Sequence, residues 1–147
     1  KMKIDIAMND SFLSLNHFSK LGTTRVFFEK VLDVLSDELN FNFERVAVIS
    51  RSFIKVNEPE KYLSSRILKV SENIKNISLS YSTEEDLDGV KLNVIKEYQT
   101  GFINETREKI LIVVQEVNNN PERNLLSSNV MMSIYDYSAD KIDNFTL

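Results

Sequence analysis

The sequence contains no cysteine, one histidine and only three glycines among its 147 residues. Without cysteine, the chain can form no disulfide, thiol nucleophile, iron–sulfur cluster or cysteine-ligated zinc site. Its single histidine, His17, cannot supply a two-histidine zinc site. Glycines at positions 22, 89 and 101 are too few for a phosphate-cradling loop or a dinucleotide-binding fingerprint. The sequence therefore predicts no metal ion and no cofactor, and the lack of cysteine fits a reducing, cytoplasmic setting.

Long apolar runs and an excess of positive charge are missing as well. The longest apolar run, Ile110 to Val114, is far shorter than the roughly 20 residues that span a bilayer, so we expect no membrane segment. The formal net charge is -4 and the isoelectric point is near 5.1. Binding to a phosphate backbone needs clustered Lys and Arg, so this balance argues against nucleic acid and favours a protein or small-molecule partner.

What is present suits one compact domain over residues 1–147. Hydrophobic residues make up 42% of the chain. Its length suits one domain with a sizeable core and is short for two domains. Apolar residues alternate in some segments and recur at helical spacing in others. The predicted elements are a hairpin over 3–8 and 12–18, a helix over 26–40, a strand over 44–56, a helix beginning after Asn57 with apolar positions up to Ile74, and strands over 77–82, 90–98, 109–117 and 129–137.

These elements predict an α+β fold. The hairpin, a long central strand and a C-terminal meander form a mostly antiparallel sheet, because the connections in the meander are too short for crossover helices. The two amphipathic helices pack on one face of that sheet. On the long strand, the even positions such as Val48 and Ile54 are predicted to face the core.

The stretch STEEDLDGV concentrates acidic side chains ahead of a glycine: Glu84, Glu85, Asp86 and Asp88. A helix-loop-helix calcium site would need a Glu at the twelfth position of its loop, and counting from Glu84 that position is Ile95. Asp-Gly between alternating segments is instead a strong hairpin signal. We expect the acidic tip of a hairpin, whose carboxylates are candidate contact or steering groups for a basic protein partner.

The segment from Val130 to Tyr137 carries large groups on both faces of its predicted strand. Tyr and Met are enriched at protein interfaces, so Tyr135 and Tyr137 are candidate partner-binding residues, and the strand is a candidate edge for homo-oligomer formation. A core strand covered on both faces is the alternative interpretation.

The chain combines an aromatic hairpin end at His17-Phe18, an amphipathic helix, the segment FERVAVISRSFIKVNEPEKYL and a final apolar, acidic strand, VMMSIYDY. This order of elements resembles the latter part of a sporadically distributed bacterial family of uncharacterised proteins. The chain departs from that family in lacking its N-terminal portion. The resemblance implies no catalytic motif and no activity.

Two classes of function are open at this point. The acidic balance and the lack of a catalytic constellation favour a non-enzymatic bacterial or phage protein that blocks a protein partner, as immunity proteins and anti-defence inhibitors do. The alternatives are a small-ligand protein or enzyme with a site assembled from dispersed residues such as His17, Arg51 and a tyrosine, or a component of an oligomeric assembly. No catalytic residue is assigned.

Overall fold

The computed structural model describes residues 4–9, 12–17, 20–40, 42–70, 74–120 and 124–146, with the backbone alone described in the first two ranges. The chain forms two compact units. Unit 1 combines Lys1–Asn42 with Ser127–Leu147, and unit 2 is the stretch between them, Phe43–Leu126. Whether residues 1–147 fold as a single domain stays a prediction.

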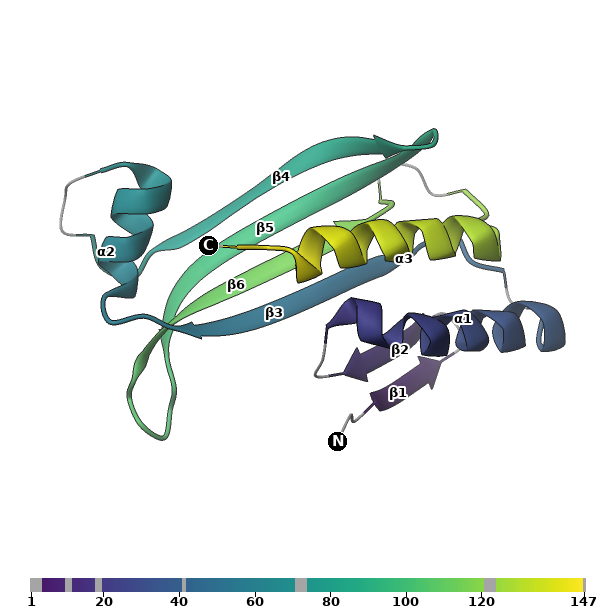
Figure 1. Cartoon of the computed structure of the whole chain (residues 1–147), viewed down its shortest axis with the longest axis horizontal. Helices are drawn as coiled ribbons and strands as arrows, with labels where there is room; N and C mark the ends of the chain where they lie inside the picture. Colours follow the sequence, from purple (N-terminus) through teal and green to yellow (C-terminus); the bar gives the residue numbers. More distant parts are fainter. Residues whose placement is uncertain are drawn as a thin grey trace. The chain divides into compact units, whose positions relative to one another are not determined.

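Unit 2 contains a four-stranded antiparallel sheet (Figure 1). Its strands are β3 Ala47–Lys55, β4 Ser78–Leu87, β5 Val90–Phe102 and β6 Lys109–Asn118, in the spatial order β3-β6-β5-β4. The predicted α+β fold with an antiparallel sheet is confirmed, and β4, β5 and β6 form the meander. The prediction that the long strand is central is wrong. Among the described strands β3 pairs only with β6, which leaves β3 at an edge of the sheet.

One short helix belongs to unit 2. It consists of α2, Pro59–Leu63, and a wider π-type turn, Ser64–Leu68, and it contacts β5 and β6. The helix begins one residue later than predicted, because Glu58 rather than Asn57 is the N-cap and Pro59 is the first helical residue. It also ends before Ile74, since Lys69 adopts the left-handed conformation that commonly terminates helices.

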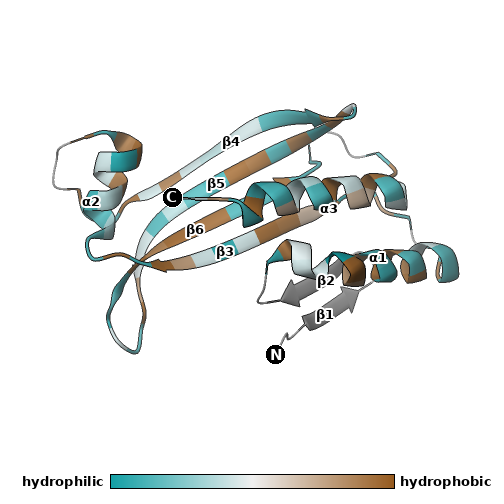
Figure 2. Cartoon of the chain, viewed as in Figure 1, coloured by the Kyte–Doolittle hydropathy of each residue, from teal (hydrophilic) through white to brown (hydrophobic). Residues whose placement is uncertain are grey.

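The two faces of the four-stranded sheet differ in burial. Side chains alternate between faces along each strand, as Figure 2 shows by the alternation of apolar and polar residues on β3, β5 and β6. One face forms the core of unit 2, and Val48 of β3 lies on it as predicted. Its buried members are Val48, Leu92, Val94, Tyr98, Leu111, Val113, Gln115 and Val117.

The opposite face is called the open face. Only Ile110 and Asn118, at the two ends of β6, are buried among its described side chains, and the others are half-buried or exposed. The set, aligned by the strand registers, is Ala47, Ile49, Arg51, Phe53 and Lys55 on β3, Ile110, Ile112, Val114, Glu116 and Asn118 on β6, Lys91, Asn93, Ile95, Glu97, Gln99 and Gly101 on β5, and Ser78, Ser80, Ser82, Glu84 and Asp86 on β4.

Unit 1 contains the predicted N-terminal hairpin and two helices. Strands β1 Ile4–Asn9 and β2 Phe12–His17 pair with each other in a separate two-stranded sheet, so the hairpin does not extend the main sheet. A single 3-10 turn, Leu21–Thr24, leads into α1 Arg25–Asp33, and a π-type turn over Val34–Glu38 continues it. The predicted helix over 26–40 is therefore confirmed in substance.

The predicted strand over 129–137 is wrong, because this segment is part of α3, Ser128–Asp143. The Ser127 side chain caps the helix by accepting a hydrogen bond from the Val130 backbone N–H. The buried residues on this helix follow helical spacing and lie on one stripe. They are Met131, Ile134, Tyr135, Ser138 and Ile142.

Candidate functional site

The open face has an apolar centre next to the β3 edge. Ile49 and Phe53 are 57% and 63% exposed. Their cross-strand neighbours on β6 are Glu116 and Ile112, and Val114 lies opposite Arg51 between them. Contiguous exposed apolar side chains with a polar rim are typical of protein-interaction surfaces. The sequence contains the signal for this patch, since Ile49 and Phe53 occupy positions of opposite parity to the core residues of the same strand.

Basic side chains lie beside these apolar groups on β3. Arg51 stands between Ile49 and Phe53 on the same face, and in the described part of the chain its guanidinium makes no ion pair. The Lys55 ammonium lies 2.7 Å from a Glu108 carboxylate oxygen. This contact lowers the pKa of the Glu108 carboxyl below its ordinary value. Arg51 is thus the exposed cation left to meet an anionic group from another molecule.

The acidic stretch lies on the opposite edge strand. Glu84, Glu85 and Asp86 belong to β4 itself, and Asp88 occupies the turn that follows. Because side chains alternate, Glu84 and Asp86 lie on the open face and Glu85 on the other. Glu84 is 3.4 Å from the Lys91 ammonium, an exposed pair. The open face therefore carries carboxylates at its β4 edge and cations at its β3 edge.

The turn at Asp88-Gly89 agrees with the hairpin prediction. Both residues have positive φ, 51° and 87°, as a type I′ turn requires. A carboxylate oxygen of Asp86 accepts a hydrogen bond of 2.9 Å from the Gly89 N–H. One of the acidic groups is thus engaged in stabilising the turn.

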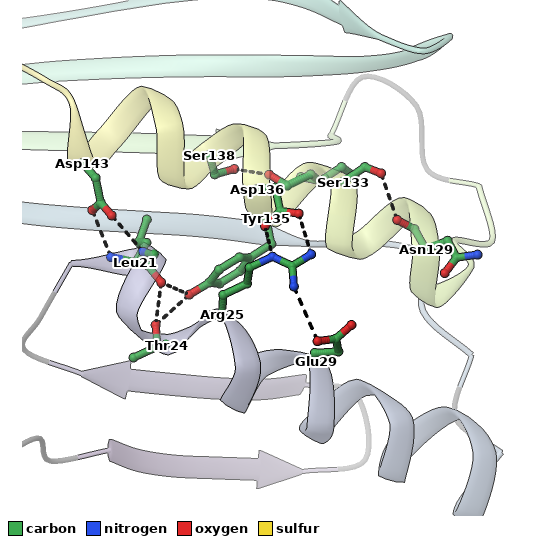
Figure 3. A network of polar contacts seen from close by, with 12 residues as sticks. Leu21, Thr24, Arg25, Glu29, Asn129, Ser133, Tyr135, Asp136, Ser138 and Asp143 are labelled. Atoms are coloured by element: carbon green, nitrogen blue, oxygen red, sulfur yellow. Dashed lines mark hydrogen bonds and ion pairs between the residues drawn. The ribbon is translucent and has the colours of Figure 1, made fainter.

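Tyr135 and Tyr137, predicted on an edge strand, lie on α3 in unit 1. Tyr135 is 5% exposed, and its ring stacks on Phe28 with centroids 4.4 Å apart. Its hydroxyl donates to the Leu21 carbonyl at 2.7 Å and lies 2.7 Å from the Thr24 hydroxyl (Figure 3). Burial raises the pKa of Tyr135 above its ordinary value. These contacts make Tyr135 part of the unit 1 interior.

Tyr137 occupies a half-buried position two residues further along α3. Its ring lies under the Lys141 ammonium, 5.2 Å from the ring centroid. This geometry is a cation–π contact within one helix. Of the two predicted tyrosines, Tyr137 is the one whose surface is partly accessible.

Two carboxylates of α3 bind α1 and the turn before it (Figure 3). Asp136 accepts two hydrogen bonds from Arg25, at 2.6 Å and 2.9 Å, and this pairing raises the pKa of the guanidinium. Asp143 accepts from the backbone N–H groups of Leu21 and Gly22 at 2.9 Å and 2.8 Å. The polar groups of α3 therefore join the two chain segments of unit 1.

Tyrosines also meet on the core face of unit 2. The rings of Tyr81 and Tyr98 stack with centroids 6.4 Å apart. Burial first, and then a hydrogen bond with Tyr81, raises the pKa of Tyr98 to about 12. The Tyr98 phenol therefore stays protonated near neutral pH.

The dispersed site of the alternative hypothesis stays a prediction. His17 ends β2 in unit 1, and its side chain lies outside the described residues. Arg51 lies on β3 in unit 2. Within the described ranges no group of three or more acidic or histidine side chains is placed to hold a metal ion. No helix in those ranges is both long and apolar enough to cross a membrane.

Comparison of the chain with family models, with curated proteins and with solved structures gives no match.

Proposed function

We propose that this chain is a non-enzymatic protein that binds another protein through the open face. The observation that carries the proposal is the exposure of Ile49 and Phe53, at 57% and 63%, beside the half-buried Ile112 and Val114 on the open face. Burying apolar area of this kind contributes about 25 cal/mol per Å², which favours association in water. The class of function is that of an inhibitor, immunity or anti-defence protein of bacterial or phage origin.

Charge at the two edges of the open face supports specificity for the partner. Arg51 sits within the apolar centre, where a partner carboxylate would be partly shielded from water. Glu84 and Asp86, with Glu85 and Asp88 nearby, form an acidic edge that favours a basic group on the partner. Complementary rim charges raise the association rate more than the affinity.

The test uses Phe53→Asp immobilised beside the wild-type chain and exposed to lysate of the native host. Val26→Asp is the matched control, because Val26 is 61% exposed on α1 of unit 1 and receives the same change. We expect at least one host protein to be retained by the wild type and by Val26→Asp but lost with Phe53→Asp. Binding of that protein in purified form then gives the affinity. Equal retention by all three chains would refute the role of the open face.

The acidic edge has its own test once that partner is purified. Replacing Glu84 and Glu85 with Gln, and Asp86 and Asp88 with Asn, should slow association at low ionic strength and change it little at high salt. Stopped-flow or surface-plasmon kinetics separate this effect from dissociation. Association kinetics unchanged at low salt would remove these carboxylates from the interface.

A further inference from the structure

The two edges of the unit 2 sheet are complementary in backbone geometry. The sheet has four strands in purely antiparallel order, so the outer strands β3 and β4 run in opposite directions. The registers proceed without a bulge along all three strand pairs. In such a sheet, the N–H and C=O groups of every second residue on each edge strand point outward. Those of one edge therefore have the spacing needed to pair with those of the other edge. The β4 edge of one copy can therefore continue the ladder beyond β3 of another.

The two edges are also complementary in charge. Strand β3 carries Arg51 and Lys55 and no carboxylate, whereas β4 carries Glu84, Glu85 and Asp86 and no cation. Pairing β3 with β3 of a second copy would bring cations together, and pairing β4 with β4 would bring carboxylates together. Like charges on adjacent strands are destabilising, while opposite charges stabilise the pair. Only the pairing of β3 with β4 joins unlike charges.

We propose that β3 binds the β4 edge of a second copy of this chain, in antiparallel pairing that extends the sheet from one copy to the next. In the register that places Arg51 opposite Glu84 of the second copy, Ile49 lies opposite Asp86 and Phe53 opposite Ser82. All of these side chains lie on the open face of their own copy, so the open faces of the two copies continue one another. The contact is head-to-tail, so it generates open chains or rings rather than a twofold dimer.

The inference goes beyond the partner proposed above, although Arg51, Glu84 and Asp86 serve both proposals. Edge pairing uses backbone groups in the plane of the sheet, and a partner on the open face uses side chains that project from it. Retention of a host protein from lysate tests the partner, while sedimentation of the purified chain alone tests the assembly. The two proposals can therefore fail separately.

The experiment is sedimentation velocity of the full chain over a concentration series, at about 20 mM and about 500 mM salt. We expect reversible association at low salt that weakens at high salt. Arg51→Glu and Glu84→Lys should each weaken it about tenfold, since each replaces an attraction by a repulsion. The double variant Arg51→Glu/Glu84→Lys should restore it, because the charges are exchanged between the edges. Far-UV circular dichroism verifies that each variant is folded.

Glu97→Lys is the matched control, because it makes the same charge change as Glu84→Lys on the open face but on the inner strand β5. Its association should equal that of the wild type. A chain that stays monomeric throughout the series overturns the proposal. So does an effect of Arg51→Glu without any effect of Glu84→Lys, which would indicate pairing of β3 with β3. Failure of the double variant to recover would also overturn it.

Discussion

Replacing Tyr135 with Phe removes one hydroxyl from a buried triangle of oxygens in unit 1. The Tyr135 hydroxyl, the Thr24 hydroxyl and the Leu21 carbonyl lie 2.7 Å to 2.9 Å from one another. These three contacts share only two hydroxyl protons, so two of them can be hydrogen bonds at any moment. The ring itself, stacked on Phe28, is retained in the variant.

The number of hydrogen bonds lost among these three oxygens determines the change in the free energy of unfolding. In Tyr135→Phe the Thr24 hydroxyl can still donate to the Leu21 carbonyl, and in Thr24→Val the Tyr135 hydroxyl can do so. Each single variant loses one hydrogen bond and leaves no hydroxyl without a partner, so each should lower the free energy of unfolding by about 1 kcal/mol. The double variant loses both bonds and should cost about 2 kcal/mol.

Urea unfolding followed by far-UV circular dichroism measures these differences by linear extrapolation. Tyr62→Phe is the control, because the Tyr62 hydroxyl makes no hydrogen bond in the described part of the chain and its ring stays beside Arg66. Its free energy of unfolding should stay within about 0.5 kcal/mol of the wild type. A cost near 3 kcal/mol for Tyr135→Phe would mean that a buried polar group is left unpaired, and a cost near zero would mean that the contacts are not hydrogen bonds. Either result would refute the expectation that two hydroxyl protons form two hydrogen bonds among these three oxygens.

Three further perturbations follow from the same structure. Asp143→Ala removes the acceptor for the N–H groups of Leu21 and Gly22 and should cost about 1 to 2 kcal/mol in urea unfolding. Gly89→Ala should cost about 1 kcal/mol, since nothing lies within 4 Å of an added Cβ and the penalty comes from the positive φ alone; Gly89→Asn should cost less. The pKa of Tyr98 is about 12 in the folded chain and about 10 in the unfolded chain. Its contribution to the free energy of unfolding is therefore complete below pH 10 and is lost as the pH rises toward about 12. Absorbance titration should show this late tyrosine step, and Tyr98→Phe should reduce it, leaving the late ionisation of Tyr135, whose pKa burial also raises.

The sequence predicts the β3, β5 and β6 segments well because their patterns are local. Alternation along β3 places Val48 on the core face and Ile49 and Arg51 on the other, and the structure agrees. The Asp-Gly dipeptide requires positive φ at both residues and therefore marks the turn unambiguously. What alternation cannot provide is the partner of a strand. That β3 pairs with β6 depends on contacts between distant segments, so its edge position emerges only from the fold.

The segment over 129–137 shows how composition can outweigh spacing. Its Val, Ile and Tyr residues favour a strand, and Met, Ser and Tyr alternate along it. The buried positions Met131, Ile134, Tyr135 and Ser138 nevertheless follow the helical intervals of three, one and three residues, and Ser127 is a good N-cap. Those two signals, weighed together, predict the helix and would have placed Tyr135 on its buried stripe.

The discontinuity of unit 1 gives the chain a fixed order of assembly during synthesis. Arg25 and its partner Asp136 are separated by 111 residues, and every strand of unit 2 lies between them. At typical translation rates the ribosome needs on the order of ten seconds to cover that interval. Throughout it, unit 2 can complete its sheet while α1 has no α3 to pair with. A nascent chain arrested before residue 127 should therefore expose the Arg25 face of α1, the surface on which α3 later docks.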